Sequence, residues 1–206
     1  MCIAITSLWA FFVYESARRT VAHEGYELGM APVEGVLTLT ALGLCAYTLS
    51  AGPRSYAIDV MTVGAAMIVW CDLRWGIMLD ISTGATAFLT IVAAIAFSSS
   101  QADVRSTLLG ALIVAGIPAL IYVASRGRAM GRGDIFLGFS IGAAFGLDLL
   151  GPFFAFWCIT SFAGYAIVRL MGRRHGEEIV LGPFMGIAVL LTIGFANQAS
   201  MILGRV

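Results

Sequence analysis

The sequence has few charged residues, since Asp, Glu, Lys and Arg make up 12% of its 206 residues. All of its basic residues are Arg, and the formal net charge is zero, which argues against a nucleic-acid partner. Hydrophobic residues make up 60% of the chain, and the mean hydropathy is +0.94. A soluble domain of this size does not need so much apolar surface. The composition therefore indicates a polytopic membrane protein whose surroundings are a lipid bilayer.

Paired cysteines are also missing from the sequence. The widely spaced cysteines and histidines are Cys2, Cys45, Cys71, Cys158, His23 and His175. Zinc sites usually place thiolates or imidazoles at short, regular spacing. We therefore expect neither a metal nor another cofactor, and we interpret the thiols as small apolar side chains.

Long apolar runs predict the fold. They cover residues 35–52, 56–71, 81–97, 107–124, 135–150, 152–168 and 179–196. Each can cross about 30 Å of hydrocarbon as a helix, which satisfies its own backbone in lipid. Residues 1–14 are apolar but short, and basic residues follow them, which favours a retained anchor or interfacial helix over a cleaved signal peptide. The predicted fold is all-α, a polytopic integral membrane bundle of seven to eight transmembrane helices.

The arginines predict how these helices are oriented. We divide the chain into residues 1–34, an N-terminal apolar helix with a polar cytoplasmic loop, and residues 35–206, a membrane-embedded domain. Nine of the twelve arginines lie in four loops, at residues 15–34, 72–80, 125–134 and 169–178. The alternate loops and the C-terminus hold the other three. By the positive-inside rule, the first set of loops is cytoplasmic.

An acidic residue stands where one apolar run begins. Asp134 follows Gly131-Arg132-Gly133 directly, and a carboxylate at a membrane edge is costly enough to need a partner or a function. In the predicted topology, Asp72 and Asp80 flank cytoplasmic helix ends. The other candidates fall toward the far side, namely Asp59, Asp103 and Asp148. Asp72, in the last turn of its predicted helix, is therefore the expected partner of Asp134.

The glycine spacing predicts that the helix carrying Asp134 packs closely against another helix. Asp134, Gly138, Gly142 and Gly146 repeat every four residues and share one face. Small residues at this spacing let two helix backbones approach each other closely. Two carboxylates that meet there hold a single shared proton near neutral pH. Such a pair suits aspartyl proteolysis, in which the ionised member activates water and the protonated member polarises the scissile carbonyl.

These residues resemble the motifs of the type IV prepilin peptidases, which are membrane aspartyl proteases of the G-x-G-D class. The matching segments are Gly131-Arg132-Gly133-Asp134 with Leu137, Asp72-Leu73-Arg74 followed by Leu79-Asp80 and Thr83, and Leu181-Gly182-Pro183-Phe184. The resemblance covers about residues 30–196. It makes residues 35–206 a membrane-embedded peptidase domain.

The resemblance implies a function and a location. Asp72 and Asp134 would be the catalytic pair, and the substrates would be prepilins or pseudopilins of a type IV pilus or protein secretion system. Such substrates carry a short basic leader, which is cut at the cytoplasmic face of the bacterial inner membrane. The side-chain-free Gly131 and Gly133 would let the substrate backbone approach. Asp80 and Pro183 are expected to bind substrate or shape the site.

The sequence also departs from the family pattern. Phe136 stands where the family usually has Lys, Leu79 replaces Pro, and Leu181 replaces Phe. The cysteine-rich methyltransferase segment of the long enzymes has no counterpart, which predicts a peptidase without that activity. A catalytically inactive homologue that serves as an assembly component of a pilus or secretion system is the alternative. A small transporter with the two aspartates as a proton relay is a third hypothesis.

Simpler interpretations of single residues stay open as well. Asp134 can cap a helix N-terminus, and Asp72 can pair with Arg74 or another loop arginine. Gly138-Phe139-Ser140-Ile141-Gly142 matches the G-x-S-x-G pattern of serine hydrolases. That chemistry needs a strand, a sharp turn and a histidine base, so we expect Ser140 to be a residue within a helix.

Overall fold

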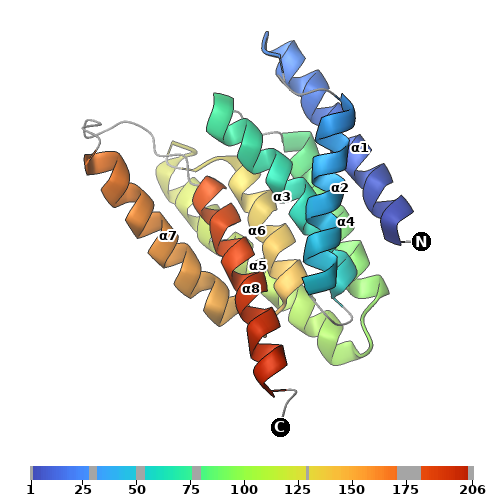
Figure 1. The fold of residues 1–206 in the computed structure, drawn as a ribbon. Helices are drawn as coiled ribbons and strands as arrows, with labels where there is room; N and C mark the ends of the chain where they lie inside the picture. The colour runs from blue at the N-terminus through green and yellow to red at the C-terminus, as the bar shows by residue number, and fades with distance from the viewer. Residues whose placement is uncertain are drawn as a thin grey trace.

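The fold is built from helices alone in every part of the chain that is described. A computed structural model describes residues 2–27, 32–49, 54–75, 80–128, 130–170 and 182–203. The helices are α1 (Cys2–His23), α2 (Pro32–Leu49), α3 (Ser55–Trp75), α4 (Asp80–Ala96), α5 (Gln101–Ser125), α6 (Arg132–Phe145), α7 (Leu150–Leu170) and α8 (Gly182–Leu203). They form a helical bundle, in which α1 and α7 lie at opposite sides (Figure 1). The predicted all-α class is confirmed.

Several of the helices are apolar enough for a membrane. Ser55–Trp75, Gln101–Ser125 and Leu150–Ile167 are both long and apolar enough to cross a bilayer, and α2, α4 and α8 contain shorter apolar stretches. Large apolar side chains point outward on these helices, including Leu120 and Phe162, which are 72% and 78% exposed. Such a surface fits contact with lipid. The count of seven to eight crossings stays a prediction.

Helix α3 lies at the centre of the bundle. It contacts α1, α2, α4, α6 and α8, while α6 packs on α5, α4 and α3 (Figure 1). One apolar core joins α3 and α6 to α7 and α8 through side chains such as Ile68, Leu137, Phe153 and Met185. A second core joins α3 to α1 and α2. The two helices that carry the candidate aspartates therefore contact each other inside the bundle.

Helix α1 extends further than the sequence indicated. Residues 15–23, predicted to belong to a polar loop, continue the helix to His23. Their buried residues, Ala17 and Val21, continue the helical spacing of the buried Tyr14. On the exposed side, Glu15 accepts hydrogen bonds from Arg18 and Arg19, three and four residues later, at 2.8 and 2.9 Å. Such pairs stabilise a helix, so polarity alone did not end it.

Helix α6 spans Arg132–Phe145, so it both begins and ends earlier in the chain than the predicted run at 135–150. Gly146 follows with φ of +58°, a conformation that glycine adopts readily. The Arg54 guanidinium, just before α3, donates to the Phe145 carbonyl oxygen at 2.6 Å and pairs with Asp148 at 3.0 Å. The start of α3 therefore meets the end of α6. The two helices run antiparallel.

The glycine face of α6 packs against α5. A Cβ atom added to Gly138 would lie 2.9 Å from the Ala115 Cα atom, and one added to Gly142 would overlap the Gly110 backbone. Only residues without a side chain permit so close an approach of two backbones. The predicted helix contact at this face is present, and the helix that it contacts is α5 rather than α3.

Candidate active site

Asp72 lies in the last turn of α3 and is almost completely buried. Its side chain is 5% exposed, and its Oδ2 atom accepts no hydrogen bond from any described residue. The helix continues past it to Trp75, which keeps the carboxylate on a rigid element. Buried carboxylate oxygens are normally hydrogen-bonded, so an unsatisfied one needs an explanation.

Asp134 is the third residue of α6 and is 6% exposed. Its Oδ2 atom accepts a hydrogen bond from the Gly131 backbone N–H at 3.1 Å. This is the bond that an acidic side chain makes to the N-cap residue in a capping box. The capping interpretation is therefore right for one oxygen. The other oxygen, Oδ1, is buried and accepts nothing from the described residues.

The fold brings these two carboxylates together. Asp72 is near the end of α3 and Asp134 near the start of α6, and the two helices run antiparallel in direct contact. Both carboxylates therefore lie at the same end of the bundle, on two helices that touch. Each presents one buried oxygen that no described residue satisfies. The arrangement is a pair of acids at one end of the bundle.

Apolar side chains surround the pair. Ile68 lies one turn before Asp72 and Leu137 one turn after Asp134, and neither is exposed at all. Met130, in the loop before α6, joins the same apolar core. Electrostatic interactions are stronger in such surroundings than in water.

The two predicted glycines differ in exposure. Gly131 is exposed and forms the N-cap of α6, whereas Gly133 is buried beside Asp134. A Cβ atom at Gly131 would approach nothing closer than 3.8 Å. The fold itself therefore does not require a glycine at position 131.

The other predicted site-shaping residues are found at helix starts. Asp80 is the exposed first residue of α4, and its charge acts on Arg132. It lies at the end of the bundle where α6 begins. Pro183 is buried as the second residue of α8, where a proline fits the first helical turn. With Val69 of α3 it lines a narrow crevice of about 130 Å³. Leu79 and Leu181 lie outside the described residues.

Two simpler interpretations are decided by the contacts. The Arg74 guanidinium lies over the Trp75 ring, 5.6 Å from its centroid, and no ion pair joins it to Asp72 in the described part of the chain. Pairing of Asp72 with Arg74 is therefore wrong.

Ser140 is buried within α6, and its hydroxyl donates to the Phe136 carbonyl oxygen at 3.0 Å. As predicted, it is a residue within a helix and not a nucleophile on a turn.

A third acid, Asp59, was set aside in the sequence because of its far-side position, and it is also buried. Asp59 of α3 is 2% exposed, and the Thr6 hydroxyl of α1 donates to its Oδ2 atom at 2.5 Å. It lies at the opposite end of α3 from Asp72. The only signal for its burial was a carboxylate within an apolar run, and its partner was remote in sequence.

Helix α4 also buries a set of hydroxyl groups, of which only that of Thr83 belongs to a motif noted in the sequence. They belong to Ser82, Thr83, Thr86 and Thr90, none of which is exposed. The Ser82 hydroxyl donates to the Ser16 hydroxyl of α1 at 2.8 Å. Small polar residues at helical spacing in an apolar run were the available signal. These hydroxyls make the interior face of α4 polar.

Neither metal ligands nor relatives identify the site further. Within the described ranges, no three His, Cys, Asp or Glu side chains come close enough to hold a metal ion. No protein-family model, curated protein or solved structure matches this chain. The resemblance to prepilin peptidases therefore depends on the motif residues alone and stays a prediction.

Proposed function

We propose that the protein is a membrane aspartyl endopeptidase that removes the basic leader of prepilin- or pseudopilin-like substrates. One observation carries the proposal. Two buried carboxylates from helices remote in sequence, Asp72 and Asp134, lie at the same end of two helices in contact, and each has a buried oxygen that accepts no hydrogen bond from the described residues. A pair of this kind is costly for stability and has a direct chemical use.

The chemistry follows from one proton shared between the two acids. The ionised aspartate takes a proton from a water molecule, whose oxygen attacks the scissile carbonyl carbon. The protonated aspartate donates a hydrogen bond to the carbonyl oxygen and stabilises the negative charge that develops there. The C–N bond then breaks, the leaving nitrogen takes up a proton, and the pair returns to its starting state.

A different part of the fold holds each aspartate in place. The Gly131 N–H holds Oδ2 of Asp134 and leaves Oδ1 for the reaction. The rigid last turn of α3 holds Asp72. The arginine distribution supports a cytoplasmic position for this end of the bundle, and the resemblance to prepilin peptidases implies that the membrane is a bacterial inner membrane. A helix terminus at the membrane edge would also give water access to the pair.

Cleavage of a leader–pilin fusion in membranes tests the proposal. We expect Asp72→Asn and Asp134→Asn each to lower the cleavage rate by at least about a hundredfold, because each removes one proton-transfer group. Asp59→Asn is the matched control, since Asp59 is an equally buried acid of the same helix as Asp72 but remote from the pair. It should cleave at the wild-type rate.

The same assay separates the alternatives. A catalytically inactive homologue would leave the fusion uncut in the wild type, and pilus assembly would be unchanged in the two asparagine variants. A proton-coupled transporter would take up its solute in vesicles with the wild type and lose uptake in the variants. Unimpaired cleavage by either variant, with normal insertion and folding, would refute the two-aspartate mechanism.

A further inference from the structure

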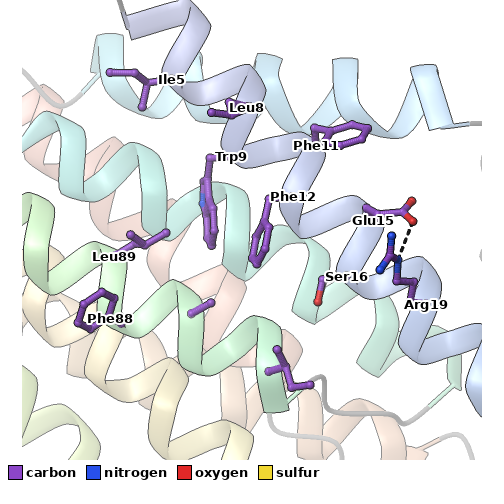
Figure 2. Close-up of a pocket in the computed structure, with 12 residues that line it drawn as sticks. Ile5, Leu8, Trp9, Phe11, Phe12, Glu15, Ser16, Arg19, Phe88 and Leu89 are labelled. Atoms are coloured by element: carbon purple, nitrogen blue, oxygen red, sulfur yellow. Dashed lines mark hydrogen bonds and ion pairs between the residues drawn. The ribbon is translucent and has the colours of Figure 1, made fainter.

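A long groove runs between α1 and α4 on the outer surface of the bundle. Its volume is about 960 Å³. Figure 2 shows Trp9 and Phe12 reaching from α1 toward α4, whose Phe88 and Leu89 lie opposite. The Trp9 and Phe12 rings stack with centroids 5.4 Å apart, and the Trp9 indole N–H donates to the Val60 carbonyl oxygen of α3 at 3.0 Å. This wall of the groove is therefore fixed by the fold.

The polar residues of the groove all lie at one end. The apolar lining residues are Ile5, Leu8, Trp9, Phe11, Phe12, Ile81, Ala85, Phe88 and Leu89, and the polar ones are Glu15, Ser16 and Arg19 (Figure 2). From Ile5 to Arg19, α1 rises about 21 Å, at 1.5 Å per residue. One leaflet with its headgroup region is about as thick, at half of 40–45 Å. The groove thus has the length and polarity of one lipid leaflet.

The polar end carries a net positive charge. Glu15 and Arg19 line the groove and Arg18 lies beside it, and both arginines share the single carboxylate of Glu15, so the three side chains together carry a charge of +1. Hydrogen bonds from the arginines, with Arg18 the larger contributor, lower the pKa of Glu15 to about 2, so it stays ionised. Arg19 is 77% exposed and uses only its Nε atom toward Glu15 among the described residues. Its terminal nitrogens can meet a phosphate in the forked geometry that guanidinium groups favour.

We infer that this groove binds an anionic phospholipid, whose phosphate group lies at Arg19 and Arg18 and whose acyl chain lies between α1 and α4. The net positive end favours an anionic headgroup and disfavours a substrate with a basic leader. The cytoplasmic leaflet, where the arginines place this end of α1, is also the anionic leaflet. The inference depends on the membrane location in the proposed function but not on peptidase activity. An inactive chain would bind the lipid equally well.

Native mass spectrometry of the purified full chain tests this inference. Phosphatidylglycerol and phosphatidylcholine with identical acyl chains are titrated in mild detergent, and the apparent dissociation constant of the first bound lipid is measured. We expect tighter binding of phosphatidylglycerol. Arg19→Gln should weaken phosphatidylglycerol binding about fivefold and leave phosphatidylcholine unchanged, because it removes one interfacial charge. Arg128→Gln, at an exposed arginine of the loop after α5, is the matched control and should change neither.

Two further variants identify the occupant. Glu15→Gln raises the local charge from +1 to +2 and should strengthen phosphatidylglycerol binding, whereas a site for a basic peptide would be weakened by it. Ala85→Phe fills the apolar part and should weaken both lipids, with helical content checked by circular dichroism. Equal binding of the two lipids by the wild type, or equal effects of the Arg19 and Arg128 variants, would overturn the inference. Displacement of phosphatidylglycerol by a leader–pilin peptide that Glu15→Gln weakens would also overturn it.

Discussion

Replacement of Gly142 by alanine gives the sharpest test of how α6 is held. Its added Cβ atom would lie 2.7 Å from the Ala111 Cα atom of α5 and would also overlap the Gly110 backbone. Ordinary van der Waals contact begins at 3.4 Å. The two helices must therefore separate locally by about 0.7 Å or more, because backbone atoms cannot rotate away as a side chain can.

The size of the effect follows from two opposed contributions. Overpacking of a close contact costs about 1–3 kcal/mol. Alanine is favoured over glycine within a helix by about 0.5–1 kcal/mol, which offsets part of that cost. We expect a net loss of about 1 kcal/mol, and at most about 2.5 kcal/mol, in the free energy of unfolding. Gly110→Ala acts at the same contact, so the double variant should lose less than the sum of the two single losses.

Gly116→Ala provides the matched control. A Cβ atom at Gly116, in the interior of α5, would have no neighbour within 4 Å, so only the helix preference acts. The same substitution should therefore raise stability by about 0.5–1 kcal/mol. Unfolding by a denaturing detergent, followed by circular dichroism, measures both variants. Equal stabilities of Gly142→Ala and Gly116→Ala would show that the α5–α6 backbones do not approach as closely as described.

Two further predictions concern side chains on α6 or at its C-terminal end. Arg54→Gln should lower the free energy of unfolding by about 1.5–3 kcal/mol, because it removes the charged hydrogen bond to the last carbonyl group of α6. Asp148→Asn should lower it by less than about 1 kcal/mol, because Asp148 is 76% exposed. Detergent unfolding of both variants checks this ranking, and a larger loss for Asp148→Asn would contradict it. Ser140→Ala should leave cleavage of the leader–pilin fusion unchanged, since its hydroxyl bonds within its own helix; a hundredfold loss of cleavage with normal folding would reinstate a serine mechanism.

The helical class and most helix positions were predictable from apolar runs. Such runs are long, and lipid requires each of them to satisfy its own backbone. Helix ends were harder to predict. Residues 15–23 of α1 are polar, yet they continue the helix because one face stays buried and Glu15 pairs with arginines one turn later. A run that reads as one helix at 135–150 ends at Phe145, because Gly146 turns the chain and Arg54 binds the last carbonyl group.

The sequence could also predict which aspartate would pair with Asp134, but for a different reason. Charge bias fixes which helix ends share a membrane face, and only Asp72 and Asp80 then remained as partners for Asp134. Charge bias could not predict which helices would pack against α6. The glycine spacing marks the face of α6 that meets another helix, but the same spacing would fit α3 or α5 equally well. The groove between α1 and α4 also depends on that unpredicted arrangement.

Asp59 shows why proximity, rather than burial, singles out the proposed catalytic pair. It is as buried as Asp72 and Asp134, and it lies on the same helix as Asp72. The Thr6 hydroxyl of α1 donates to its Oδ2 atom, so a lone carboxyl group there can serve as a hydrogen-bonded link between helices, although its Oδ1 atom is buried and accepts nothing from the described residues, as in the pair. Asp72 and Asp134, in contrast, lie at the same end of two helices in contact, and two adjacent acids can exchange one proton as a lone acid cannot. If asparagine at position 59 abolished cleavage as completely as at 72 and 134, burial alone would explain the losses and the pair would have no special role.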